Sequence, residues 1–169
     1  HQLAVIEMGA NHPGEIKTLV DIACPNVGLI TNVGKAHLEG FGSFEGVIQT
    51  KSELYDFLRA TGGQAFVNLD NPILYEKSEG INRIGYGIEK NNGQVQGEIT
   101  ANAPFLAMRW HNFGDTTQYL LATKLIGAYN AENVLAAVCV GRYFDVDSSL
   151  ICEAINNYTP QNNRSQLTE

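Results

Sequence analysis

The sequence predicts an α/β fold, with a mostly parallel sheet flanked by helices and an antiparallel meander in the second half of the chain. Two patterns indicate this fold. In the first half, short apolar runs alternate with amphipathic stretches of helical spacing, as in a parallel sheet wrapped by helices. After Asn82, short alternating runs follow one another between turn residues, which is typical of antiparallel strands.

In the first half, apolar runs predict strands over residues 3–7, 27–33 and 64–69. A helix is expected from about residue 14 to residue 23, where Cys24-Pro25 stops it. A second helix surrounds Lys51 and stops before Gly62-Gly63, and a short third helix covers residues 73–79. This order of elements predicts that the strands lie parallel, with helices between them.

In the second half, strands are expected over residues 83–88, 95–101, 106–110 and 117–123. Two helices should follow, over residues 130–144 and, after a start signal at Asp147-Ser148, over residues 148–158. The stretch after Thr159 is polar and aperiodic. We therefore expect residues 1–160 to form one domain and residues 161–169 to be a hinge toward a further domain.

The composition limits the possible classes of function. The chain has 169 residues, 44% of them hydrophobic, which is enough to bury a core. Its 18 acidic and 11 basic residues give a net charge of -7, so a basic surface for nucleic acid is not expected. No apolar run approaches the ~20 residues of a membrane span.

The cysteines and the first residues of the chain give two further expectations. Cys24, Cys139 and Cys152 are widely spaced in apolar helical contexts and no signal peptide is visible, so we expect reduced core residues. The chain starts at His1 and enters a strand pattern almost at once, without an initiator Met. It is therefore expected to be a piece of a longer protein.

Lys51 is an unusual residue for its position. The apolar residues of its predicted helix recur at three- and four-residue spacing, and Lys51 lies in the middle of that face. Burial favours the neutral amine. A neutral lysine amine can react with carbon dioxide to give a carbamate, which is an anion that binds metals. On periodicity alone, a side chain that extends to solvent is an equal alternative.

Glu7 and His37 are two further candidate ligands, because each lies at or just beyond the end of an apolar run. In open α/β sheets, ligands bind outside the carboxyl ends of the strands. Glu7, His37 and Lys51 are therefore candidates to hold a magnesium ion together. Magnesium prefers oxygen ligands, and this set includes an imidazole nitrogen. Phosphate oxygens would therefore have to complete the coordination shell of the metal. Considered one at a time, a histidine in a loop or a carboxylate at the end of a strand is more often not a metal ligand than a ligand.

Asn130 and Asn133 lie three residues apart near the start of a predicted helix, so they share one face of it. Their amides could meet a purine edge through paired donor and acceptor bonds. The plainer alternative is that Asn130 caps the helix, which would leave Asn133 unexplained.

Arg164, Asn11 and His12 are weaker candidates. Arg164 can reach an adenine ring or a phosphate, although most linker arginines are merely solvated. Asn11 and His12 lie in a loop that leads into a helix and could touch a substrate, whereas Glu15 could be only a partner of the helix dipole. The sequence has no G-x-x-x-x-G-K-[ST] loop, so the candidate metal site has no phosphate-binding loop of its own.

Three strings of the sequence closely resemble the central domain of the Mur ligases. They are EMGANHPGEI at residues 7–16, TNVGKAHLEGFGS at residues 31–43 and KSEL at residues 51–54. The resemblance extends from Glu7 to about Arg164 and is strongest to the branch that adds D-alanyl-D-alanine to UDP-N-acetylmuramoyl-tripeptide. It implies a domain like the P-loop NTPases, with the phosphate loop and the sugar-nucleotide domain upstream and an amine-presenting domain downstream.

The resemblance implies catalytic and metal-binding roles for three residues. Glu7 and His37 match the magnesium ligands of the family. Lys51 matches the lysine that is carbamylated, helps to hold a second magnesium ion and orders the acyl phosphate chemistry.

The resemblance also implies an ATP site. Asn130 and Asn133 match asparagines beside the adenine, and Arg164 matches the hinge arginine that faces the nucleotide. Tyr129 stands where many relatives have histidine, so a role for this side chain is in doubt.

The implied reaction is one of peptidoglycan synthesis in the bacterial cytoplasm. ATP phosphorylates the terminal carboxylate of the UDP-muramoyl tripeptide, and D-alanyl-D-alanine attacks the acyl phosphate, which gives the pentapeptide precursor, ADP and phosphate. We expect the chain alone to be inactive. Two alternatives stay open: a related ligase such as a folylpolyglutamate synthase, and a nucleotide- or metal-binding module without catalysis.

Overall fold

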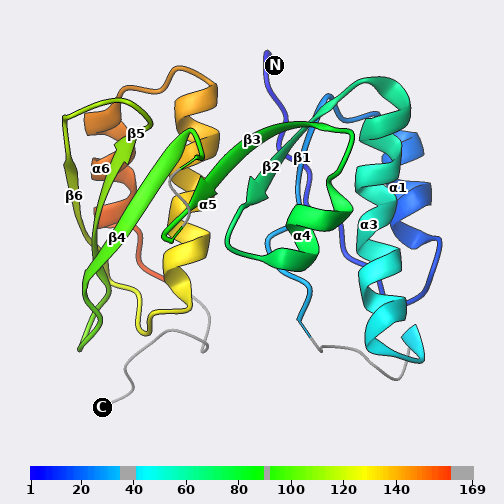
Figure 1. The fold of residues 1–169 in the computed structure, drawn as a ribbon, viewed down its shortest axis with the longest axis horizontal. Helices are drawn as coiled ribbons and strands as arrows, with labels where there is room; N and C mark the ends of the chain where they lie inside the picture. Colours follow the sequence, from blue (N-terminus) through cyan, green and yellow to red (C-terminus); the bar gives the residue numbers. More distant parts are fainter. Residues whose placement is uncertain (35–40, 90–91, 161–169) are drawn as a thin grey trace. The chain divides into compact units, whose positions relative to one another are not determined.

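The computed structural model describes residues 1–34, 41–89 and 92–160, and these confirm the predicted α/β fold (Figure 1). The helices and strands are, in chain order, α1 (Glu15–Ala23), β1 (Val27–Leu29), α3 (Phe44–Thr61), β2 (Gln64–Asn68), α4 (Pro72–Lys77), β3 (Asn82–Gly87), β4 (Val95–Ala101), β5 (Ala107–Asn112), β6 (Tyr119–Ala122), α5 (Asn130–Tyr143) and α6 (Ser148–Asn157).

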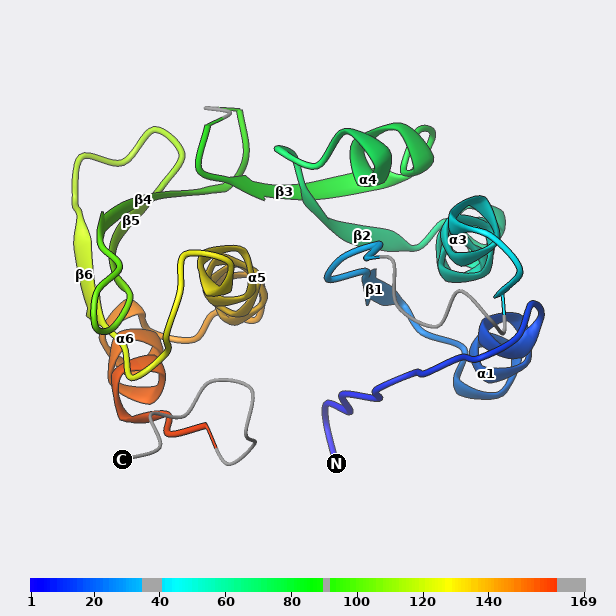
Figure 2. The same ribbon diagram turned by 90° about the horizontal axis from the view of Figure 1, so that it is seen from below.

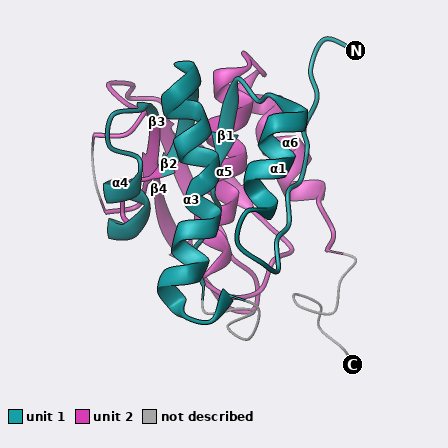
Figure 3. Ribbon diagram, turned by 90° about the vertical axis from the view of Figure 1, so that its right-hand side faces the viewer, with its two compact units in different colours: residues 1–67, 71–83 teal, residues 68–70, 84–169 magenta. Residues whose placement is uncertain are grey.

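The described residues form two compact units (Figure 3). Unit 1 contains residues 1–67 and 71–83, and unit 2 contains residues 68–70 and those from residue 84 onward. The strand order of the sheet follows the chain from β1 to β6. β1 and β2 are parallel, as are β3 and β4, whereas β4, β5 and β6 are antiparallel neighbours.

The antiparallel meander is confirmed for β4 to β6, but β3 is not part of it. Gln94, the residue before β4, lies beside the middle of β3, where its N–H donates to the carbonyl of Gly85 at 2.7 Å. A Cβ atom on Gly93 would lie 2.7 Å from that same carbonyl oxygen, so glycine permits the close approach. As a result, β4 starts opposite Tyr86 and runs in the same direction as β3.

The predicted strand over residues 3–7 is wrong. Residues 1–10 form no helix or strand, and the side chains of Leu3, Val5 and Ile6 are 53%, 87% and 59% exposed. An apolar run becomes a buried parallel strand only where neighbouring strands supply hydrogen bonds and helices cover its faces. Among the described strands, none pairs with this segment. The second predicted strand, over residues 27–33, is shorter than expected, since β1 ends at Leu29.

Unit 1 has its core on one face of α3, which packs against α1 and β1 (Figure 2). The helix begins after Ser43, whose hydroxyl accepts a hydrogen bond from the N–H of Gly46 at 3.0 Å. It ends at Gly62, which has a φ of 71° and donates its N–H to the carbonyl of Leu58. The buried apolar side chains of the helix are Val47, Ile48, Tyr55 and Leu58.

Unit 2 has its core between its strands and the last two helices, with α5 against β4 and α6 against β6. Gly97 lets α5 approach the sheet, because a Cβ atom there would lie 2.6 Å from the side chain of Leu135. Trp110, opposite Gly97 in β5, is fully buried, and its ring stacks on Tyr119 at 4.6 Å.

The cysteines are all free thiols, as predicted, but only Cys139 is buried. Desolvation raises the pKa of the Cys139 thiol to about 12. Cys24 is exposed, because it lies at the C-cap of α1 with a φ of 48° rather than on the packed face of that helix. In the described parts of the chain, no helix has the length and apolar character needed to cross a membrane.

Candidate functional site

Lys51 lies on the packed face of α3, as the spacing predicts. One turn before it lies Val47 and one turn after it lies Tyr55, and both are buried. The side chain is half-buried, and its amine donates a hydrogen bond to the main-chain carbonyl of Asn32 at 2.7 Å. Desolvation lowers the pKa of the Lys51 amine from its ordinary value.

These surroundings suit carbamate formation at Lys51. Carbon dioxide reacts with the neutral amine, whose fraction rises as the pKa falls. A carbamate nitrogen keeps one hydrogen, so the bond to the carbonyl of Asn32 is compatible with both forms of the side chain. The group would add a carboxylate to a region where the unmodified chain presents an amine.

The other two predicted metal ligands differ in what the structure shows of them. Glu7 lies in the irregular segment before α1 and is exposed to solvent. His37 lies outside the described residues. Within the described ranges, no group of three or more His, Cys, Asp or Glu side chains is placed to hold a metal ion. Of the three predicted ligands, Lys51 is the one that the structure shows half-buried, with its amine hydrogen-bonded to the carbonyl of Asn32.

The loop with Asn11 and His12 is held by the carboxylate of Glu15. The N–H groups of Asn11 and His12 donate to Glu15 Oε2 at 2.7 and 3.1 Å, and His12 Nδ1 lies 3.5 Å from Oε1. The bond from the Asn11 N–H, followed by that from His12, lowers the pKa of the Glu15 carboxyl. Glu15 is thus more than a partner of the helix dipole, because it closes the loop before α1.

Glu53 is a residue of this site that the sequence reasoning missed. Its two carboxylate oxygens accept hydrogen bonds from the N–H groups of Gly14, at 2.8 Å, and Lys17, at 2.7 Å. The available signal was at the start of α1, where Gly14 offers no side chain to cap the helix. The first N–H groups of α1 therefore needed an acceptor from elsewhere in the chain.

In unit 2, Asn130 and Asn133 form the predicted pair at the start of α5. The Asn130 amide donates to the carbonyl of Ile126 at 2.9 Å, and the Asn133 amide lies 3.5 Å from the Asn130 side-chain oxygen. The capping alternative is wrong, because the N-cap is Tyr129 and no side chain caps the helix. Asn130 is 7% exposed, whereas Asn133 is exposed and can face a ligand. Arg164 lies outside the described residues.

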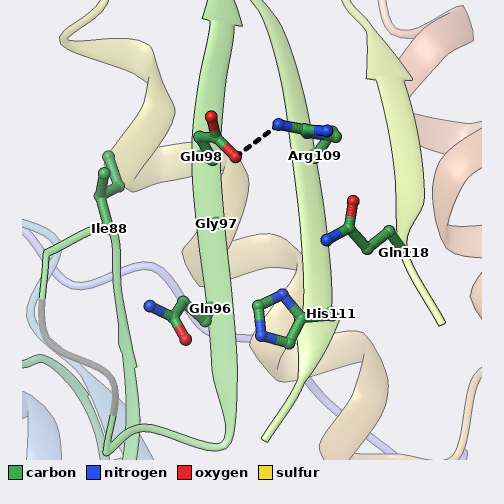
Figure 4. A pocket seen from close by; sticks show the side chains of 7 residues that line it. All are labelled: Ile88, Gln96, Gly97, Glu98, Arg109, His111 and Gln118. Atoms are coloured by element: carbon green, nitrogen blue, oxygen red, sulfur yellow. Dashed lines mark hydrogen bonds and ion pairs between the residues drawn. The ribbon is translucent and has the colours of Figure 1, made fainter. Parts of the chain in front are cut away.

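A shallow polar pocket in unit 2 lies over β4 and β5 (Figure 4). Its side chains include Glu98 and Arg109, which form an ion pair at 2.7 Å, together with His111 and Gln118. The carboxylate of Glu98 neutralises the arginine, so the pocket presents no excess positive charge for a phosphate. It contains none of the predicted site residues.

Comparison with known proteins identifies relatives over most of the chain. Residues 1–141 match the family described as the Mur ligase middle domain. The UDP-N-acetylmuramoyl-tripeptide–D-alanyl-D-alanine ligase of Haemophilus influenzae is 32% identical over 140 residues, which are 83% of this chain and 30% of that protein. The ligase of the same name from Escherichia coli is 33% identical over 151 residues, covering 83% of this chain and 31% of that protein.

Solved structures of MurF ligases are also similar to this chain. MurF from Acinetobacter baumannii superimposes with a TM-score of 0.81 at 27% identity, over 97% of this chain and 36% of that chain. MurF from Thermotoga maritima, solved in complex with ADP, has a TM-score of 0.71 at 26% identity, over 90% of this chain and 35% of that chain. The chain thus spans about a third of the length of these relatives.

Proposed function

The chain belongs to the Mur ligase family, with residues 1–141 matching its middle domain, and from this premise we propose that the full-length protein joins D-alanyl-D-alanine to UDP-N-acetylmuramoyl-tripeptide with ATP. The product is a pentapeptide precursor of peptidoglycan. The relatives named above carry this activity in their names, and their similarity covers 83% of the chain.

One structural observation carries the proposal. The three strings that resemble the family are joined by hydrogen bonds at α3. Lys51, in the third string, donates to Asn32 in the second, and Glu53, also in the third, accepts from Gly14 in the first. Residues that are separate in the sequence are thus attached to one helix within three residues of each other, which supports a shared site around α3.

The proposed reaction has two steps. A terminal carboxylate oxygen of the tripeptide bonds to the γ-phosphorus of ATP, and ADP leaves. The amine nitrogen of D-alanyl-D-alanine then bonds to the acyl carbon, inorganic phosphate leaves, and the amine gives up a proton as the amide forms. Both steps bring anions together, so positive charge and the exclusion of water favour them.

Lys51 has the central role in this proposal, with Glu7 and His37 as the metal ligands. The half-buried amine of Lys51 becomes a carbamate, which its lowered pKa favours, and the bond to Asn32 orients it. Magnesium, when bound by Glu7, His37 and the carbamate, supplies positive charge beside the phosphate oxygens.

The nucleotide contacts are proposed in unit 2 and in the C-terminal stretch. The exposed amide of Asn133, oriented through Asn130, offers a donor and an acceptor to the adenine edge. Arg164 would face the nucleotide from residues 161–169, the proposed hinge that follows a nucleotide-binding domain of residues 1–160. We place the enzyme in the cytoplasm, where its nucleotide-linked substrate and ATP would meet.

The test is a ligase assay on the full-length protein and on the 169-residue chain alone. With ATP, magnesium and both substrates, the full-length protein should form pentapeptide and release phosphate, and the chain alone should form none. A full-length protein that acts on folate and glutamate instead, or that binds ATP without turnover, would contradict the proposal. So would pentapeptide synthesis by the chain alone.

A further inference from the structure

Glu53 connects two elements of the proposed site. Its side chain projects from α3, two residues after Lys51, and both of its oxygens bind main-chain N–H groups at the start of α1. The acceptor is a carboxylate and the donors are N–H groups at a helix N-terminus, which is the geometry of charge-assisted hydrogen bonds. They are at 2.8 and 2.7 Å, and they join residues 39 and 36 positions apart.

The start of α1 depends on this carboxylate. Gly14, the N-cap residue, has a φ of 85° and no side chain that can accept a hydrogen bond. A helix usually obtains such an acceptor from its own Ser, Thr, Asp or Asn at this position. Here the acceptor comes from the helix that contains Lys51. Glu53 therefore fixes the start of α1 relative to α3.

A second carboxylate extends this connection to the loop before α1. Glu15, in the first turn of α1, accepts hydrogen bonds from the N–H groups of Asn11 and His12. The loop is thus fixed to α1 by Glu15, and α1 is fixed to α3 by Glu53. The two carboxylates together connect the loop to the helix that contains Lys51.

We propose that Glu53 is a positioning residue of the ligase, which holds the Asn11–His12 loop in register with Lys51 so that the loop can bind the muramoyl peptide. This inference rests on the proposed function, since Asn11, His12 and Lys51 have their roles only there. Glu53 itself touches no substrate in this account. Its effect is on where the peptide binds, not on the transfer of phosphate.

The first test is amide hydrogen exchange in the full-length protein. Replacing Glu53 by Ala should speed exchange of the Gly14 and Lys17 amides by about tenfold or more, since charge-assisted hydrogen bonds are lost. Glu53→Gln keeps one acceptor oxygen and should give an intermediate increase. Amides in the middle of α3 should be unaffected. The matched control is Asp56→Asn on the same helix, where the carboxylate pairs with Arg59 at 2.7 Å and is solvent-exposed.

The second test is a comparison of the Michaelis constants. Glu53→Ala should raise the KM for UDP-N-acetylmuramoyl-tripeptide by about tenfold, with a smaller increase for Glu53→Gln, and leave the KM for ATP nearly unchanged. A purely structural role would lower the amount of folded enzyme and so reduce the measured kcat without a selective change in one KM. Asp56→Asn should match the wild type in both constants.

The outcomes separate the two proposals. A wild-type protein that makes no pentapeptide overturns the proposed function, whatever exchange shows at Gly14 and Lys17. An active wild type whose Glu53→Ala variant keeps its peptide KM, or shows unchanged exchange at those amides, overturns the positioning role alone.

Discussion

At the scale of single residues, the position of Lys51 couples packing to chemistry. Its helix buries the neighbouring apolar side chains on the same face, so the amine loses part of its hydration. The carbonyl of Asn32 replaces one water but brings no full negative charge. Desolvation therefore dominates, and it shifts the equilibrium from the ammonium to the neutral amine.

The lowered pKa of Lys51 gives a pH prediction. Because the neutral amine is the reactive form, labelling of Lys51 by an acylating reagent should reach half of its maximum at a lower pH than labelling of free Nα-acetyl-lysine added as a reference. Competitive labelling over a pH series, followed by mass spectrometry of the Lys51 peptide and of the reference compound, measures both midpoints. The comparison uses midpoints, so slower access of the reagent to a half-buried amine does not affect it. Equal midpoints, or a higher one for Lys51, would contradict the desolvation argument.

Individual side chains were predictable where a pattern constrained them. Lys51 interrupts an apolar helix face, and this pattern left burial of the amine and extension to solvent as equal alternatives, of which the structure shows a half-buried side chain. Glu53 was not predictable in this way, because its partners are main-chain groups of Gly14 and Lys17 far away in the sequence. Nothing in local periodicity specifies which carboxylate will cap a helix that has no cap of its own.

At the scale of elements, the packing of α5 on β4 depends on the absence of a side chain at Gly97. A Cβ atom there would lie within 2.6 to 3.1 Å of three atoms of Leu135, which is fully buried and has little room to move. Gly97 is also directly opposite the fully buried Trp110, so it lies in a closely packed part of the core.

Replacing Gly97 by Ala should therefore reduce the free energy of unfolding of the chain by about 1–3 kcal/mol, the usual cost of overpacking a core. Urea denaturation monitored by the fluorescence of Trp110 measures this change. Gly9→Ala is the matched control, because a Cβ atom there would meet nothing within 4 Å, and it should leave stability unchanged. Equal stability of both variants would show that α5 yields at this contact.

The helices and most of the strands followed from the sequence. Apolar residues at helical spacing placed α5 to within about a residue, and the stop signal at Gly62-Gly63 placed the end of α3. The strand prediction for residues 3–7 was wrong, because an apolar run in the sequence looks the same whether or not a partner strand is available. The prediction that β3 and β4 belong to one antiparallel meander was also wrong, since their parallel pairing depends on how closely Gly93 approaches β3.

At the scale of the whole molecule, the two units contain different residues of the proposed site. Unit 1 contains Lys51, Glu53 and the Asn11–His12 loop, and unit 2 contains the Asn130–Asn133 pair. The chain spans about a third of the length of its relatives, so turnover is a property that we assign only to the full-length protein. Domain closure around the substrates would exclude water from an acyl phosphate that would otherwise hydrolyse.

The most direct test of the account is chemical rescue of a Lys51→Ala variant of the full-length enzyme. If a carbamate on Lys51 supplies a required carboxylate, the variant should lose most of its pentapeptide synthesis, and added acetate or formate should partly restore it. Lys17→Ala, which removes an exposed amine paired with Asp21, is the control and should respond to neither change. Wild-type rates in Lys51→Ala, or a loss that no small carboxylate reverses, would contradict the carbamate at Lys51.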